Sequence, residues 1–112
     1  MYIVSIDKLM EFYVEALQQC NMQLLKMDND DIGYYIFEEF IVGAGAFLHE
    51  STLTKLIEAE LITREIAEKS TILRNKFFSL EDTDLWTIES VKTASEWREI
   101  FELSDEIKTM LN

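Results

Sequence analysis

The chain has 112 residues, the length of one ordinary domain, and we expect a single helical domain over residues 1–112. Hydrophobic residues make up 48% of the chain, enough apolar surface to offset chain entropy and to exclude wholesale disorder. With 22 acidic against 10 basic residues the net charge is −12, which disfavours binding to nucleic acid or anionic lipid and favours positively charged partners.

The first half of the chain has a helical pattern, and the chain contains no proline and only three glycines. From Ser5 to about Met27, apolar residues recur at spacings of three and four, which predicts an amphipathic helix. A second helix is predicted to start with Asp30 or Asp31 as its cap, to run through "GYYIFEEF" and to end where "VGAGAF" places two glycines close together. A minor β element at "MYIV" or "GAGAF" is the alternative for those residues.

The second half begins with a short predicted helix that has Ser51 as its N-cap. The next helix starts after Thr63, whose hydroxyl is predicted to cap it. The inner face of that next helix is predicted to hold Ile66, Ala67, Ser70, Leu73 and Phe77. "SLEDTDLW" predicts a loop, and Thr87 caps a brief turn after it.

Thr93 and Glu96 have the spacing of a capping box at the start of a final helix. The apolar stripe of this helix is predicted to hold Trp97, Ile100, Phe101, Ser104, Ile107 and Leu111. Five or six helices with short connections predict an all-α fold, a compact orthogonal bundle.

The stretch "DNDDIGYYIFEEF" raises the question of a metal site, because several of its residues match the calcium-binding loop of EF-hands. The match fails at Ile32 and Ile36, which stand where that loop needs oxygen ligands. Magnesium held loosely by the three aspartates is an alternative, but adjacent acids at a helix start more often serve capping and the helix dipole. We therefore predict no metal site and no cofactor.

Nucleophilic catalysis has few candidate residues in this chain. His49 is the only histidine, and with Ser51 it is interpreted as a capping group rather than as part of a catalytic triad. Cys20 lies among apolar helical positions, which predicts a small buried side chain. We therefore expect that the protein is not an enzyme.

Localisation is predicted from the same sequence. A single cysteine cannot form an internal disulfide, which favours a reducing compartment, and no segment has the length and apolarity of a signal peptide or a membrane span. We expect a cytoplasmic protein without membrane contact.

Unbalanced negative charge marks two candidate binding segments. The first is predicted to contact a partner through carboxylates and an exposed tyrosine, the residues Asp28, Asp30, Asp31, Tyr34, Tyr35, Glu38 and Glu39. Two adjacent tyrosines on a helix project about 100° apart, so at least one of them is expected at the surface. The second segment contributes Glu81, Asp82 and Asp84.

Three stretches, "DDIGYYIFEEF", "FLHESTLTKLIEAELIT" and "SVKTASEWREIFELSDEIKTML", together resemble the small acidic helical immunity proteins carried beside polymorphic bacterial toxins, as in contact-dependent growth inhibition systems. The resemblance is one of overall pattern from about Asp30 to Leu111. It implies that the protein binds the C-terminal domain of a cognate toxin, often a nuclease with a basic surface, and blocks its active site or substrate surface.

Two other functions fit the same sequence. An anti-defence protein or nucleic-acid mimic would use the same acids against a different basic groove. A non-catalytic regulatory or scaffold subunit would associate through exposed parts of the last helix.

Overall fold

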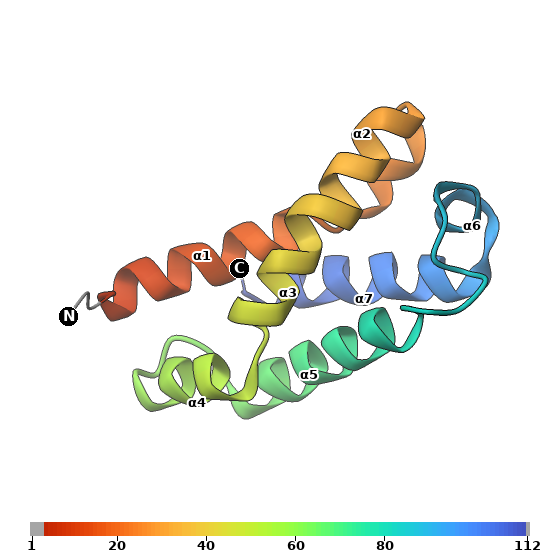
Figure 1. Cartoon of the computed structure of the whole chain (residues 1–112). Helices are drawn as coiled ribbons and strands as arrows, with labels where there is room; N and C mark the ends of the chain where they lie inside the picture. The colour runs from red at the N-terminus through yellow and green to blue at the C-terminus, as the bar shows by residue number, and fades with distance from the viewer. Residues whose placement is uncertain (1–3, 112) are drawn as a thin grey trace.

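A computed structural model describes residues 4–111, and all of its regular secondary structure is helical (Figure 1). The helices are α1 (Ile6–Gln18), the 3-10 helix η1 (Met22–Lys26), α2 (Asn29–Gly33), the π-helical segment η2 (Tyr34–Phe40), α3 (Ile41–Phe47), α4 (Glu50–Glu58), α5 (Arg64–Ser79), α6 (Ile88–Thr93) and α7 (Ser95–Leu111). The predicted all-α bundle is confirmed. "GAGAF" is helical, so a strand there was wrong, and Met1–Ile3 of "MYIV" lie outside the described residues.

Helix α1 begins as predicted, with the Ser5 hydroxyl accepting a hydrogen bond from the Lys8 amide. It ends at Gln18, so the prediction of one helix to about Met27 was wrong in its second half. Side chains of α7 bind carbonyls at this point: the Ser104 hydroxyl donates to Leu17 and the Lys108 ammonium to Cys20. The Leu17 carbonyl also accepts from the Cys20 amide at 3.1 Å, so the Ser104 hydroxyl is its second donor. Lys108 binds a carbonyl just past the end of the helix.

A single continuous helix runs through α2, η2 and α3, because the junction residues all have helical backbone angles. Every fourth residue of this stretch is fully buried: Ile32, Ile36, Phe40, Ala44 and Leu48. In an ordinary α-helix a spacing of four rotates by about 40° per step, or about 160° over the stretch. The wider turns of η2, with hydrogen bonds five residues apart, reduce this rotation and keep the apolar residues on the core side.

The two glycines of "VGAGAF" lie inside α3, so the prediction that they end the helix was wrong. Gly43 is buried where α3 crosses α1, and a Cβ atom added to it would lie 2.8 Å from the Cβ of Ala16. The missing side chain therefore allows the two helices to approach closely. This contact joins residues 27 positions apart in the chain, which local pattern analysis does not detect.

The helix caps confirm part of the sequence analysis. Thr63 and Thr87 cap α5 and α6 as predicted. The cap of α4 is His49, whose Nδ1 accepts from the Ser51 amide, so the assignment of Ser51 as cap was wrong. Thr93 is the last residue of α6 and its hydroxyl donates to the Glu89 carbonyl, so the predicted capping box at α7 was also wrong.

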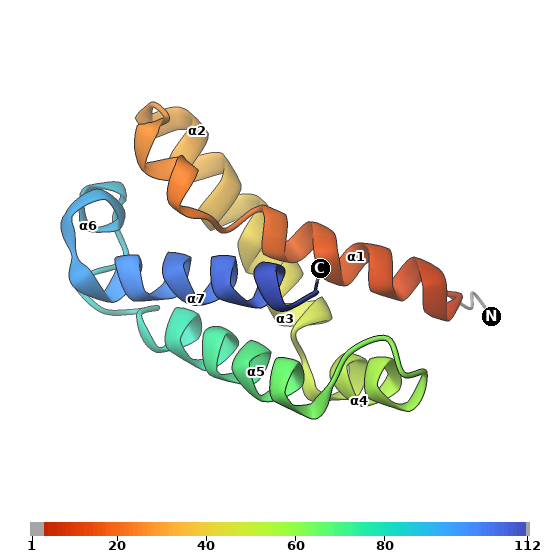
Figure 2. The same cartoon turned by 180° about the vertical axis from the view of Figure 1, so that it is seen from behind.

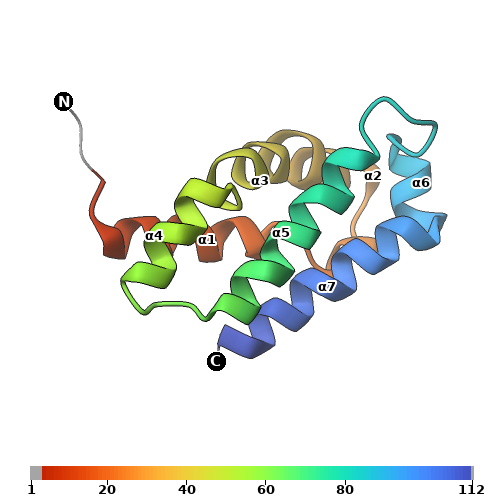
Figure 3. The same cartoon turned by 90° about the horizontal axis from the view of Figure 1, so that it is seen from below.

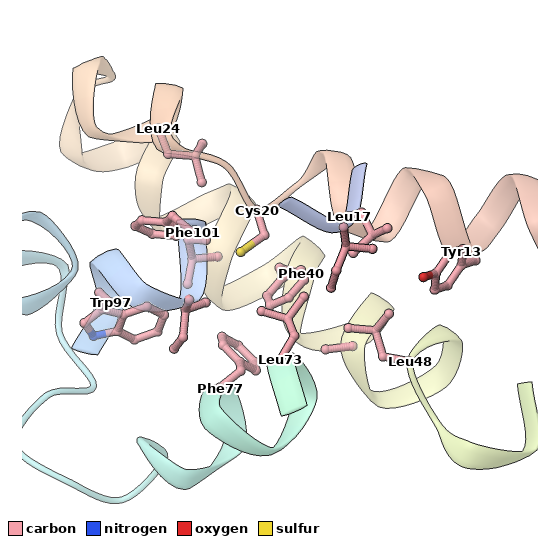
Figure 4. Packing of buried hydrophobic residues seen from close by; sticks show 14 of the residues in the cluster. Tyr13, Leu17, Cys20, Leu24, Phe40, Leu48, Leu73, Phe77, Trp97 and Phe101 are labelled. Carbon is pink, nitrogen blue, oxygen red and sulfur yellow. The ribbon is translucent and has the colours of Figure 1, made fainter. Parts of the chain in front are cut away.

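Helices α5 and α7 lie side by side and run in opposite directions, as Figures 1 and 2 show. Their predicted inner stripes are confirmed, except that Leu111 is only partly buried. Seen from below in Figure 3, α1 and α3 lie behind this pair. Between the layers, Phe40, Phe77, Trp97 and Phe101 belong to one buried cluster with Leu17 of α1 and Leu73 of α5, as the close view shows (Figure 4).

A polar pair joins α1 to α5 inside this core. The Ser70 hydroxyl donates to the Ile66 carbonyl at 2.9 Å, so it accepts the 2.7 Å hydrogen bond from the Tyr13 hydroxyl. Tyr13 has no exposed surface, and burial raises its pKa to about 12, against a smaller opposing effect of the hydrogen bond with Ser70.

Gly43→Ala is expected to lower the free energy of unfolding by about 1–3 kcal/mol, because the new methyl group forces α1 and α3 apart. Gly45→Ala is the matched control, since its Cβ would meet only the Phe78 ring at 3.9 Å and alanine favours a helix over glycine by up to about 1 kcal/mol. Urea unfolding followed by circular dichroism measures both. Equal effects of the two substitutions would contradict the close helix crossing.

Tyr13→Phe is expected to lower the free energy of unfolding by about 1 kcal/mol at neutral pH through loss of the hydrogen bond to Ser70. Because the pKa of Tyr13 is higher in the folded than in the unfolded chain, its contribution is complete below pH about 10 and is lost as the pH rises toward 12. The difference between wild type and Tyr13→Phe should therefore narrow in urea titrations between pH 8 and pH 11. A difference that stays constant over this range would contradict the assignment.

Candidate interaction surface

The start of α2 presents the first acidic group to solvent. Asp28 caps the helix, with its carboxylate accepting from the Asp31 amide at 3.0 Å, so the cap is Asp28 and not Asp30 or Asp31 as predicted. All three aspartates are exposed. Within residues 4–111 none of them forms a salt bridge. Asp30 and Asp31 therefore present unpaired carboxylates to solvent at the positive end of the helix dipole.

The second acidic group lies on the predicted loop between α5 and α6. Glu81, Asp82 and Asp84 are exposed, and within the described chain they too lack a salt bridge. The loop is held from inside: Leu80 is buried and the Trp97 indole donates to the Leu85 carbonyl at 2.7 Å.

Trp86 anchors the loop to the core through aromatic contacts. Its ring centroid lies 5.0 Å from that of Phe37 in η2 and 5.1 Å from that of Phe77 in α5. The acidic loop is therefore packed against the helix that carries the first acidic group.

Helix α6 brings the two acidic groups to the same end of the molecule. The Lys92 ammonium donates to the Asn29 side chain at 2.9 Å, and the Gly33 backbone lies against Ile88. Figures 1 and 3 show α2, α6 and the loop after α5 together at the end opposite the N-terminus. We call this the acidic end, with the members Asp28, Asp30, Asp31, Glu81, Asp82, Asp84 and the exposed Glu89 of α6.

Sequence analysis placed the two groups in separate segments and did not include Glu89. The contact between Lys92 and Asn29 helps to hold the two groups together. These residues are 63 positions apart in the chain, so no local sequence pattern indicates their contact. The basic residues that flank these acids in the chain are Lys26, Lys76 and Lys92.

The remaining predicted residues lie on η2, away from the helix start. Tyr34 is 48% exposed, which confirms the prediction that one tyrosine reaches the surface, whereas Tyr35 is partly buried against the core. The two rings meet edge to face with centroids 5.5 Å apart. Hydrogen bonding to Glu39 and the charge of that carboxylate raise the pKa of Tyr34, so the phenol stays a neutral donor beside a negative charge.

Glu38 and Glu39 face α1 rather than the acidic end. They line a groove together with Glu15 of α1, which sequence analysis did not select. The structure therefore divides the first predicted group into two surfaces: the acidic end and this groove.

Protein-family models, curated protein sequences and solved structures contain no match to this chain. The relation to immunity proteins stays a prediction. In the part of the chain that the structure describes, no helix is both long and apolar enough to cross a bilayer. Among the same residues, no three His, Cys, Asp or Glu side chains are arranged to hold a metal ion.

The residues considered for nucleophilic catalysis have structural roles. The Nδ1 atom of His49 accepts from the Ser51 amide and lies 3.0 Å from the Ser51 hydroxyl, which is the geometry of a helix cap. Cys20 is fully buried as predicted, and burial raises the pKa of its thiol far above the ordinary value. A protonated, buried thiol does not act as a nucleophile.

Trp86→Ala is expected to lower the free energy of unfolding by about 2–4 kcal/mol, because it removes three aromatic contacts of a partly buried ring. Faster amide hydrogen exchange is expected at residues 80–87, measured by mass spectrometry. Trp86→Phe keeps one ring and should give a smaller loss of stability. Unchanged exchange in the loop of the alanine variant would show that Trp86 does not hold the loop.

Proposed function

We propose that the protein is a stoichiometric inhibitor of the immunity class, which binds a basic bacterial toxin domain, in first place a nuclease, through its acidic end. The observation that supports this is the convergence of two acidic segments at one end of the fold, where the carboxylates are exposed and have no salt-bridge partner within residues 4–111.

The electrostatics favour such a partner. A nuclease presents Lys and Arg to the phosphates of its substrate, and these side chains attract a surface that carries carboxylates in the same region. At physiological salt, charges interact over roughly 8 Å, so exposed acids grouped at one end act together on an approaching basic surface. This grouping raises the association rate and selects against acidic proteins.

The acidic end is supported by a rigid frame, which suits a tight inhibitor. Lys92, Trp86 and Trp97 each bind or pack against a neighbouring element, so the acidic loop and the start of α2 are ordered before a partner arrives. Preorganised groups lose less conformational entropy on binding. Tyr34, on the same helix, adds exposed aromatic contact area.

Helix α7 presents a polar face to solvent. Its exposed side chains in the described chain are Ser95, Glu96, Arg98, Glu99, Glu102, Glu106 and Thr109. A scaffold function through apolar association of this helix gains no support from that face.

An immunity gene is expected to follow the gene of its toxin, so the test uses the purified product of the gene directly upstream. A product without a toxin-type domain would count against the proposal. Wild type is expected to bind the toxin-type domain one to one and to abolish its killing of a host that lacks both genes. Asp30→Asn, Asp31→Asn and Asp84→Asn combined should slow association by about tenfold at low salt and flatten its dependence on salt, as stopped-flow fluorescence would show.

The matched control removes the same charge elsewhere. Glu58→Gln, Glu68→Gln and Glu102→Gln are exposed, lie outside the acidic end and have no salt bridge within the described residues. This control should bind like wild type within about twofold. Equal slowing by both triple variants would show that net charge alone matters, and a domain that kills in the presence of wild type would exclude the inhibitor function.

A further inference from the structure

A groove of about 270 Å³ runs between α1 and the η2–α3 part of the long helix. Gly43 and Ala16, which meet where the two helices cross, both belong to its lining. The volume lies just below the range of roughly 300–1,000 Å³ found for small-molecule pockets, so the groove has the size of one or two amino-acid side chains.

The walls of the groove include aromatic rings that a cation can approach. Phe12 and Phe47 are partly buried and their ring centroids lie 5.1 Å apart. The Lys8 ammonium already lies 5.5 Å from the centroid of the Phe12 ring. Lys8 does not line the groove, but its position shows that the Phe12 ring attracts a positive charge.

Carboxylates stand along the edges of the same groove. Glu15 comes from α1 and Glu38 and Glu39 from η2, and the lining contains no Lys or Arg. Within residues 4–111 none of the three forms a salt bridge. Val42, which is 66% exposed, adds apolar surface beside them.

We propose that this groove binds an arginine side chain of a basic protein partner, with the guanidinium against the Phe12–Phe47 wall and between Glu15 and Glu39. Arginine fits the chemistry better than lysine, because its planar group stacks on aromatic rings and donates hydrogen bonds to two carboxylates at once. The aliphatic stem covers Val42 and the floor of the groove. The identity of the partner rests on the proposed function, but the chemistry of the groove does not.

A second copy of this chain is a poor occupant for the groove. Two molecules with a net charge of −12 each repel one another, and the three groove carboxylates would face further acids. Charge complementarity therefore selects a basic protein.

The test is an NMR titration of the full-length protein with the blocked peptide acetyl-Leu-Arg-Ala-Leu-amide, and with the same peptide carrying citrulline in place of arginine. The arginine peptide is expected to shift the backbone amide signals of the groove residues, with a dissociation constant on the order of millimolar. The citrulline peptide, which has the same shape without the charge, should bind at least about fivefold more weakly.

Variants assign the binding to the groove. Glu39→Gln is expected to weaken the arginine peptide roughly fivefold, and Glu15→Gln to act in the same direction. Glu102→Gln, on α7 and outside the groove lining, serves as the control for a simple loss of charge and should leave the affinity unchanged. Circular dichroism melting establishes that each variant is folded.

Three results would overturn the inference: no shifts at about 10 mM peptide, shifts centred on the acidic end, or equal affinity for the arginine and citrulline peptides. The toxin-domain assay separates the two proposals. If wild type neutralises the domain but the peptide does not enter the groove, this inference fails and the inhibitor function stands. If the peptide enters the groove but no domain is neutralised, the groove chemistry stands and the inhibitor function fails.

Discussion

The aromatic cluster around Phe77 is the interaction on which the rest of the structure depends. The Phe77 ring lies 4.7–5.8 Å, between centroids, from the rings of Phe40, Phe78, Trp86 and Trp97. These rings come from the π segment, from α5, from the acidic loop and from α7. Because one cluster joins four segments, the same burial of apolar surface that stabilises the fold also holds the acidic loop beside the long helix.

The π-helical segment η2 meets a second requirement of the fold, which comes from the spacing of buried residues along the continuous helix α2–η2–α3. Apolar residues at every fourth position cannot all face one side of a regular α-helix, and the wider turns of η2 keep them on the core side. The residues between these buried positions then face away from the core in two directions. Tyr34 faces solvent, while Glu38 and Glu39 line the groove toward α1. The packing of the core thus places the polar residues that a partner would meet.

Sequence patterns were sufficient where the deciding contacts are local. The stripes of α5 and α7, the Thr63 and Thr87 caps and the acidic loop all follow from neighbours within one or two helical turns. Patterns failed where a distant residue decides. Gly43 suggested a helix end, but it lies inside α3 and its missing side chain allows the close contact with Ala16. The acidic residues could be predicted as exposed from the sequence alone. Their division between the acidic end and the groove beside α1 depends on how α6 and α1 pack against the continuous helix.

The distribution of salt bridges separates stabilising charge from available charge. The ion pairs within residues 4–111 lie along α1, along α7 and between α5 and α7, where Lys69–Glu106 and Lys76–Glu99 connect the antiparallel helices. The acidic end and the groove take part in none of them. Grouped carboxylates repel one another, which offsets part of the stabilisation that the Asp28 cap and the helix dipole provide at the start of α2. A basic partner that binds there neutralises the carboxylates, so binding is favoured both by direct attraction and by the removal of their mutual repulsion. The net charge therefore favours a partner at the acidic end and at the groove rather than at the paired helices.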